Sequence, residues 1–133
     1  MLHTTLRLAR QAGACADSYR AVAEVLGDSY GDDTPIPLTR IPDLRNLDDA
    51  LWYLRATLPE ETADRDRLSR LLACDYVERL AHYWVALPGC KWMPSDTIEV
   101  ARRYANGQAT LEELNAARDA ARDAARAAER TWQ

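Results

Sequence analysis

The residues with the most chemical potential lie in the stretch CDYVERLAH, residues 74–82. Glu78 and His82 are four residues apart, so on a helix a carboxylate and an imidazole would share one face, as two metal ligands do. Two ligands do not complete a site, and the sequence has no CxxC pair and only one other histidine. That residue, His3, is expected to be mobile. We therefore predict no metal site and expect His82 to be a charge-paired surface residue.

Asp75 and Cys74 are the candidates for acid–base or nucleophilic catalysis. Asp75 lies at the margin of an apolar helix face, where a partly buried carboxylate can act as a general acid, but Arg79 one turn on is expected to neutralise it. No basic residue is placed to activate Cys74, so a small buried apolar side chain is the better interpretation. No glycine-rich phosphate loop, GxSxG, HExxH or dinucleotide motif occurs. We predict no catalytic residue, no cofactor and no enzymatic activity; an enzyme would have to use one of these two side chains.

Two loops carry side chains typical of protein interfaces. The stretch PGCKWMPSD, residues 88–96, places Trp92 and Met93 beside the only lysine, Lys91. Aromatic residues and methionine are enriched at interfaces, although a loop tryptophan can equally fold back onto a core. The stretch GDSYGDDTPIP, residues 27–37, is expected to be an exposed loop because Gly, Asp and Pro favour turns. The predicted contact surface consists of Asp28, Tyr30, Asp32, Asp33, Lys91, Trp92 and Met93.

Negative charge is concentrated in the middle of the chain. The net charge is −4, and residues 27–66 contain ten acids and only four arginines. Such a surface would attract a basic partner and repel nucleic acid, while the alternative interpretation is a solvated acidic loop region.

The length and composition are those of one globular domain, residues 1–133. The chain is 47% hydrophobic and 29% charged, and a chain of this size can bury a core of its own. Its three cysteines form neither an even set nor a CxxC pair, so free thiols are expected. No apolar run approaches the roughly 20 residues that cross a bilayer, and the start lacks the apolar core of a signal peptide. We expect a cytoplasmic protein with no membrane contact.

The spacing of apolar residues predicts an all-α, single-domain bundle of about five or six helices. The first 26 residues are expected to form a helix broken at Gly13, and Pro42 limits any helix near it to a turn or two. The expected helices cover residues 1–26, 47–57, 64–86, 96–106 and 111–131, with a short helical segment at 38–44. The helix at 64–86 is expected to be central, because one broad face gathers Leu68, Leu72, Tyr76, Leu80, Tyr83, Trp84 and Leu87.

The last predicted helix, residues 111–131, is rich in alanine and arginine. It opens on the capping box TLEE, which begins at Thr110, and the helix before it stops at Gly107. Its alanines gather on one half of the wheel, where another helix can approach closely. The other half carries arginines interleaved with acids, with Asp119–Arg122 and Asp123–Arg126 as expected pairs. This face is expected to be solvated, and a partner or phosphate surface is the alternative.

Three blocks of the sequence resemble a family of small alanine-rich helical immunity proteins from bacteria and phages. The blocks are IPLTRIPDLRNLDDALWYLRA (36–56), RLLACDYVERLAHYW (70–84) and IEVARRYANGQATLEELNAARDAARDAARAA (98–128). The resemblance implies an all-helical fold without agreed catalytic residues and a protein that neutralises a toxin by binding it. Because phage chains share the pattern, it also implies an inhibitor of a host-defence complex such as a CRISPR nuclease. Pro42 and the loop at 87–96 depart from the family pattern.

The sequence therefore predicts a non-enzymatic inhibitor that binds a protein partner, either a nuclease-like toxin or a defence effector. The alternative function is nucleic-acid binding through the arginines of the last helix. Monomer and dimer both stay open.

Overall fold

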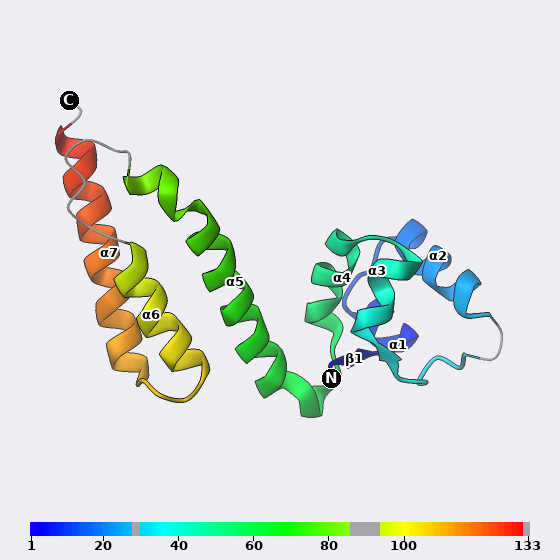
Figure 1. The fold of residues 1–133 in the computed structure, drawn as a ribbon. Coiled ribbons are helices and arrows are strands. Elements are labelled where there is room, and N and C mark those ends of the chain that lie inside the picture. Colours follow the sequence, from blue (N-terminus) through cyan, green and yellow to red (C-terminus); the bar gives the residue numbers. More distant parts are fainter. Residues whose placement is uncertain (28–29, 86–93, 132–133) are drawn as a thin grey trace. The chain divides into compact units, whose positions relative to one another are not determined.

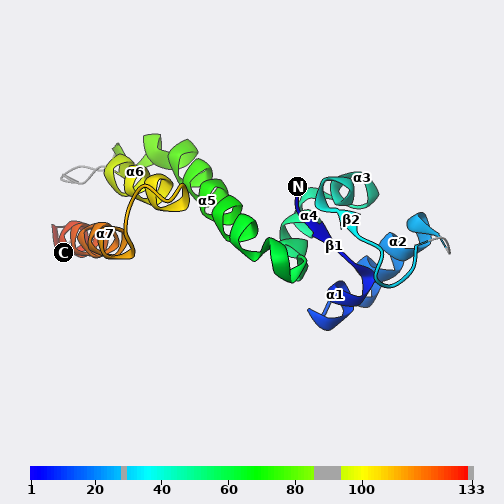
Figure 2. The same cartoon turned by 90° about the horizontal axis from the view of Figure 1, so that it is seen from below.

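The computed structural model describes residues 1–27, 30–85 and 94–131, and it is all-α except for one two-stranded sheet within these residues. The chain forms two compact units, Met1–Arg65 and Asp66–Gln133, which are described separately (Figures 1 and 2). The all-α class and the long alanine-rich last helix are confirmed. The described residues contain seven α-helices, because the expected helix over the first 26 residues divides into two and the expected short segment near Pro42 includes a helix. The single domain predicted from the length stays a prediction.

The N-terminal unit begins with strand β1, His3–Thr4, where the sequence predicted helix. This strand pairs antiparallel with β2, Ile36–Pro37, and the Leu38 amide donates to the Leu2 carbonyl at 2.9 Å. On its other side, the Leu58 amide donates to the His3 carbonyl at 3.0 Å. The prediction of helix was wrong here because the backbone of these residues bonds to distant segments, which a periodicity within 26 residues does not reveal.

Two helices follow, α1 (Leu6–Gln11) and α2 (Ala16–Leu26). The Thr5 hydroxyl caps α1 by accepting from the Leu8 amide at 3.1 Å. The predicted break at Gly13 is confirmed, because this residue has a φ of 81°, a conformation that side chains with a Cβ rarely adopt.

The rest of the unit consists of short helices. They are the 3-10 helix η1 (Leu38–Arg40), α3 (Ile41–Leu44), α4 (Leu47–Tyr53), and the 3-10 helices η2 (Leu54–Ala56) and η3 (Pro59–Glu61). Pro42 sits in the first turn of α3. Proline is tolerated at this position because a backbone N–H in the first turn would have no hydrogen-bond partner within the helix. The Asn46 side chain caps α4 by accepting from the Asp49 amide at 2.7 Å.

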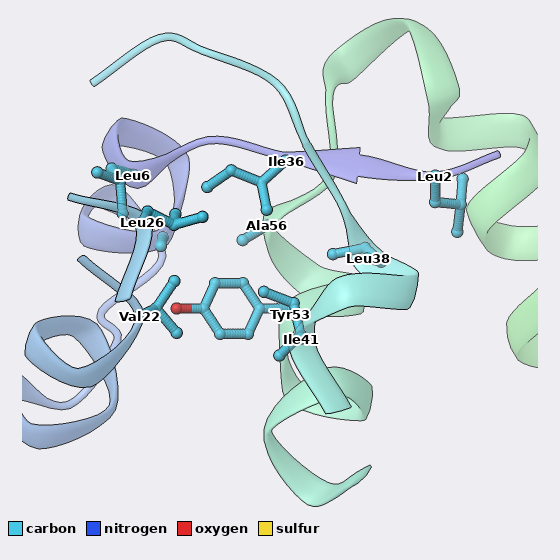
Figure 3. Close-up of a cluster of buried hydrophobic side chains, with 10 residues drawn as sticks. Leu2, Leu6, Val22, Leu26, Ile36, Leu38, Ile41, Tyr53 and Ala56 are labelled. Atoms are coloured by element: carbon cyan, nitrogen blue, oxygen red, sulfur yellow. The ribbon is translucent and has the colours of Figure 1, made fainter. Parts of the chain in front are cut away.

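One hydrophobic core holds this unit together (Figure 3). Tyr53 and Ile36 are each 1% exposed, and Val22 and Ile41 are fully buried. The sequence placed Ile36 in an exposed loop, and that prediction was wrong because the loop ends as strand β2 against β1. Full burial of such a side chain contributes about 1.5–3 kcal/mol.

His3 is held in place, contrary to the expectation that it is mobile. Its ring Nδ1 lies 2.7 Å from Glu61 Oε1, and its backbone amide donates to Glu61 Oε2 at 2.6 Å. Burial alone raises the pKa of Glu61, but the hydrogen bonds from His3 together outweigh it and hold this pKa below its ordinary value.

The C-terminal unit contains most of α5 (Thr62–Val85) with α6 (Pro94–Ala105) and α7 (Leu111–Thr131). Helices α6 and α7 lie side by side (Figures 1 and 2). The connection turns at Gly107, which has a φ of 71°. The predicted capping box is confirmed: the Glu113 amide donates to the Thr110 hydroxyl at 3.1 Å, and the Thr110 amide donates to the Glu113 carboxylate at 2.7 Å.

The face of α5 that the sequence predicted as buried is exposed. Exposed fractions are 40% for Leu68, 36% for Leu72, 52% for Tyr76 and 51% for Leu80. Cys74 is buried instead, with its Sγ 3.9 Å from the carbonyl oxygen of Ile98 on α6. The helical wheel failed because apolar residues occupy several sides of α5, and a small side chain lets α6 approach more closely than a leucine would. The side chains of Tyr83 and Trp84, and Leu87 itself, lie outside the described residues.

We predict that Ile41→Ala lowers the free energy of unfolding by about 2–5 kcal/mol, because it leaves a cavity in the core. Denaturant unfolding followed by circular dichroism measures this loss. Leu47→Ala is the control, since Leu47 is 59% exposed, and it should change stability by less than about 0.5 kcal/mol. Equal losses in the two variants would contradict the core described here.

We also predict that the free energy of unfolding falls as the pH drops below about 4.5, the ordinary pKa of Glu61. A carboxylate whose pKa is lowered by folding stabilises the protein above its unfolded-state pKa, and protonation removes that contribution. In Glu61→Gln the fall between pH 5 and pH 3 should be smaller, whereas Glu60→Gln should behave as the wild type. Identical pH profiles for all three proteins would rule out this role for the His3 contact.

Candidate functional site

The acidic loop, residues 27–37, is tied to helix α1 by ion pairs. The Asp32 carboxylate accepts from Arg10 Nη2 at 3.1 Å through both of its oxygens, and Asp33 pairs with Arg7. The Arg7 backbone amide also donates to the Asp32 carbonyl at 3.0 Å. Arg7 and Arg10 are three residues apart on α1 and therefore share a face. The negative field expected at this loop is thus partly cancelled by two arginines from outside the acidic range 27–66.

Tyrosines extend this group of charges. Arg10 donates to the Tyr19 hydroxyl at 2.7 Å, and its guanidinium lies 5.3 Å from the centre of the Tyr19 ring. The hydrogen bond to Tyr19 and then the charge of Asp32 raise the pKa of Arg10, so the guanidinium stays charged. Tyr30 is partly buried against the core, and its hydroxyl accepts from Arg40 at 3.2 Å. Arginine and tyrosine are enriched in interface hot spots.

The structure describes three of the seven predicted contact residues, and it places these three together. Tyr30, Asp32 and Asp33 lie in the acidic loop of the N-terminal unit. The other four, Asp28, Lys91, Trp92 and Met93, lie outside the described residues. That the two loops form one contact surface stays a prediction.

Sequence reasoning missed an exposed apolar surface on α5. The α5 row, defined as Leu68, Leu72, Tyr76 and Leu80, repeats every four residues and so follows one side of the helix. All four side chains are at least 36% exposed. Exposed apolar patches are typical of interaction surfaces, which makes this row a candidate for one. The signal was present in the sequence, because the same spacing led to the prediction of a buried face.

The catalytic candidates on α5 are engaged or buried. Arg102 on α6 donates to Asp75 at 2.7 Å and to Glu78 at 2.6 Å. Arg102, rather than the expected Arg79, therefore neutralises Asp75, because helix packing brings a residue distant in sequence closer than the next turn. Burial raises the pKa of the Cys74 thiol, and the prediction of a small buried residue is confirmed.

A metal site finds no support among the described residues. Within them no three histidine, cysteine, aspartate or glutamate side chains gather as metal ligands would. Glu78 pairs with Arg102, and the side chain of His82 lies outside the described part of α5.

Two of the four arginines of α7 have described acidic partners. Arg122 lies 3.4 Å from Asp119 and Arg126 lies 3.6 Å from Asp123, which confirms both predicted pairs. At exposures of 63–78% each pair is worth about 0.2–1 kcal/mol or less. The pairs therefore balance the charge along α7 but add little to the stability of the fold.

Comparison with known proteins leaves the family open. No protein-family model, curated protein or solved structure matches the chain. The resemblance to immunity proteins therefore stays a prediction. Among the described helices, none is long and apolar enough to span a bilayer.

We predict that Arg10→Met loosens the acidic loop while barely changing global stability. The substitution removes the bonds to Asp32 and Tyr19 but keeps the bulk of the side chain, so the amides of residues 30–34 should exchange faster with deuterium. The loss in unfolding free energy should stay below about 1 kcal/mol because the pair is exposed. Hydrogen-exchange mass spectrometry tests this, with Arg20→Met as the control, because Arg20 is an exposed residue of α2. Unchanged exchange in Arg10→Met would show that the ion pairs do not order the loop.

Proposed function

We propose that this protein is a cytoplasmic, non-enzymatic inhibitor that binds a protein partner, a nuclease-like toxin or a defence effector. The observation that carries the proposal is the α5 row. Contact of four large apolar side chains with water is unfavourable. A protein surface that covers them contributes roughly 25 cal/mol of binding free energy for each Å² of apolar surface removed from water. The acidic loop of the N-terminal unit, and Lys91, Trp92 and Met93 outside the described residues, are separate further candidates for contact with such a partner.

The charges favour a basic protein over a nucleic acid as the partner. The net charge is −4, and ten of the 21 acids lie between residues 27 and 66. Such a distribution suits the positively charged channel of a nuclease, because complementary fields steer association and suppress wrong partners. On α7 the acids beside Arg122 and Arg126 oppose the attraction of a phosphate backbone.

Engagement of the candidate catalytic groups supports the non-enzymatic part of the proposal. Asp75 and Glu78 are ion-paired to Arg102, and the Cys74 thiol is buried and its pKa raised. A general base or nucleophile needs an accessible side chain and a partner that activates it. Turnover that disappears with Asp75→Asn or Cys74→Ala would contradict this part of the proposal.

The test starts from partners captured from the native host with the tagged full-length protein and assayed for nuclease activity. We expect the wild type to inhibit a captured nuclease, and Leu72→Ser/Tyr76→Ser to weaken inhibition at least about tenfold, because apolar anchors carry most interface energy. The matched control is Leu111→Ser, which removes an exposed leucine of α7 that is 57% exposed. It should inhibit as the wild type does. Inhibition that is equal in all three proteins, or no captured partner, would contradict the proposal.

Nucleic-acid binding is tested separately with a gel-shift assay at low salt. We expect micromolar protein to cause no retardation of single- or double-stranded DNA or RNA, given the acids interleaved along α7. Retardation that Arg118→Gln, Arg122→Gln and Arg126→Gln progressively abolish would favour the alternative function instead.

A further inference from the structure

A cavity lies among the three helices of the C-terminal unit. Its volume is about 460 Å³, and its walls include Val77 of α5, Ile98 and Ala101 of α6, and Leu114 of α7. Pockets that bind small molecules typically measure about 300–1,000 Å³ and are mostly apolar, with a few polar groups that orient the ligand. The cavity therefore has the size and lining of a ligand site.

Small side chains keep this cavity open. Ala73 of α5 and Ala101 of α6 line it with only a methyl group each. Cys74 lines it too, and because burial raises its pKa, this wall is neutral and behaves as an apolar surface. The Thr97 hydroxyl already donates to the Ala117 carbonyl at 3.4 Å, so it does not require a ligand. The interior thus suits an aliphatic group rather than a polar one.

Two exposed arginines line the same cavity from different helices, Arg70 on α5 and Arg118 on α7. Arg118 has no described carboxylate partner, because its neighbours Asp119 and Asp123 pair with Arg122 and Arg126. Asp66, one turn before Arg70 on α5, lines a neighbouring hollow together with it. Arg70 is positioned by the ring of Tyr104, whose centre lies 5.3 Å from its guanidinium carbon.

Five other arginines of this unit have described acceptors. The described acceptors are Asn106 for Arg67, Asp75 and Glu78 for Arg102, Glu113 for Arg103, Asp119 for Arg122 and Asp123 for Arg126. Arg118 thus keeps donors free for an anion, and Arg70 adds a second positive charge at the same cavity.

We propose that this cavity binds the anion of a medium-chain carboxylic acid, with the alkyl chain against Val77, Ile98 and Leu114 and the carboxylate between Arg70 and Arg118. A guanidinium group matches a carboxylate with two parallel hydrogen bonds, and the charge makes these bonds stronger than neutral ones. Apolar walls and paired cations together select an amphipathic anion over either a neutral alcohol or a small inorganic anion.

Binding is measured by titrating sodium decanoate, below its micelle concentration, into full-length protein with ¹³C-labelled isoleucine methyl groups. The chain has three isoleucines: Ile98 lines the cavity, whereas Ile36 and Ile41 lie in the core of the N-terminal unit and serve as internal controls. We expect saturable shifts at Ile98 and none at the other two. Decanol and inorganic phosphate should bind at least about tenfold more weakly, since decanol lacks the negative charge and phosphate lacks the alkyl chain.

Three variants separate the site from nonspecific effects. Arg118→Gln should weaken decanoate binding about tenfold or more, while Arg126→Gln, two turns further along α7 and paired with Asp123, should not. Ala101→Leu should narrow the cavity and weaken the decanoate-induced Ile98 shifts without lowering the melting temperature. Equal shifts at all three isoleucines, equal affinity for decanol, or Arg118→Gln binding as the wild type would overturn the proposal. Shifts of the Ile98 methyl signal that appear when only the protein concentration is raised would also overturn the proposal, because a second copy of the chain would then occupy the cavity.

Discussion

The N-terminal unit depends on hydrogen bonds that hold residues 2–5 between two segments far along the chain. On one side lies β2, and on the other lie Thr57 and Leu58. Thr4 is fully buried at the centre of this arrangement, and its hydroxyl donates to the Ala56 carbonyl at 2.6 Å. A buried backbone group without a partner costs about 1–3 kcal/mol, so these residues stay in place only while both neighbouring segments are folded. The core of Tyr53, Ile41 and Val22 closes over the same region.

The C-terminal unit follows a different principle, in which small side chains allow close approach but bury little area. Cys74 and Ile98, at 5% and 7% exposure, are the buried apolar residues among the described residues of this unit. Helix α5 is held to α6 by Arg102, which bridges Asp75 and Glu78, and by Arg67, which donates to Asn106 at 2.9 Å. Exposed polar contacts of this kind contribute little each. Because few apolar side chains are buried in this unit, the α5 row stays in contact with water and a cavity remains between the helices.

These two features lie on different sides of α5 and call for different ligands. The α5 row is an exposed run of large apolar side chains, with Asp75 and Arg79 beside Leu72 and Tyr76, and this mixture suits a protein. The cavity is concave and combines apolar walls with Arg70 and Arg118, which suits a small amphipathic anion. Failure of one proposal would therefore leave the other standing, because they rest on different residues.

The sequence alone determined the features that depend on neighbours within one or two turns. The capping box at Thr110, the breaks at Gly13 and Gly107, and the alternation of arginine and aspartate on α7 are all read from residues at most four apart. Backbone conformation and i, i+3 or i, i+4 contacts decide them, and these do not require knowledge of the rest of the fold.

Tertiary structure decided which apolar residues meet a partner. Leu68 and Ile36 have equally apolar side chains, yet one is 40% exposed and the other 1% exposed. Likewise, Arg102 on another helix, rather than Arg79 on the same one, neutralises Asp75. A periodicity shows that a helix has an apolar side, but burial and charge pairing depend on segments distant in sequence, whose approach is set by the packing of the whole unit.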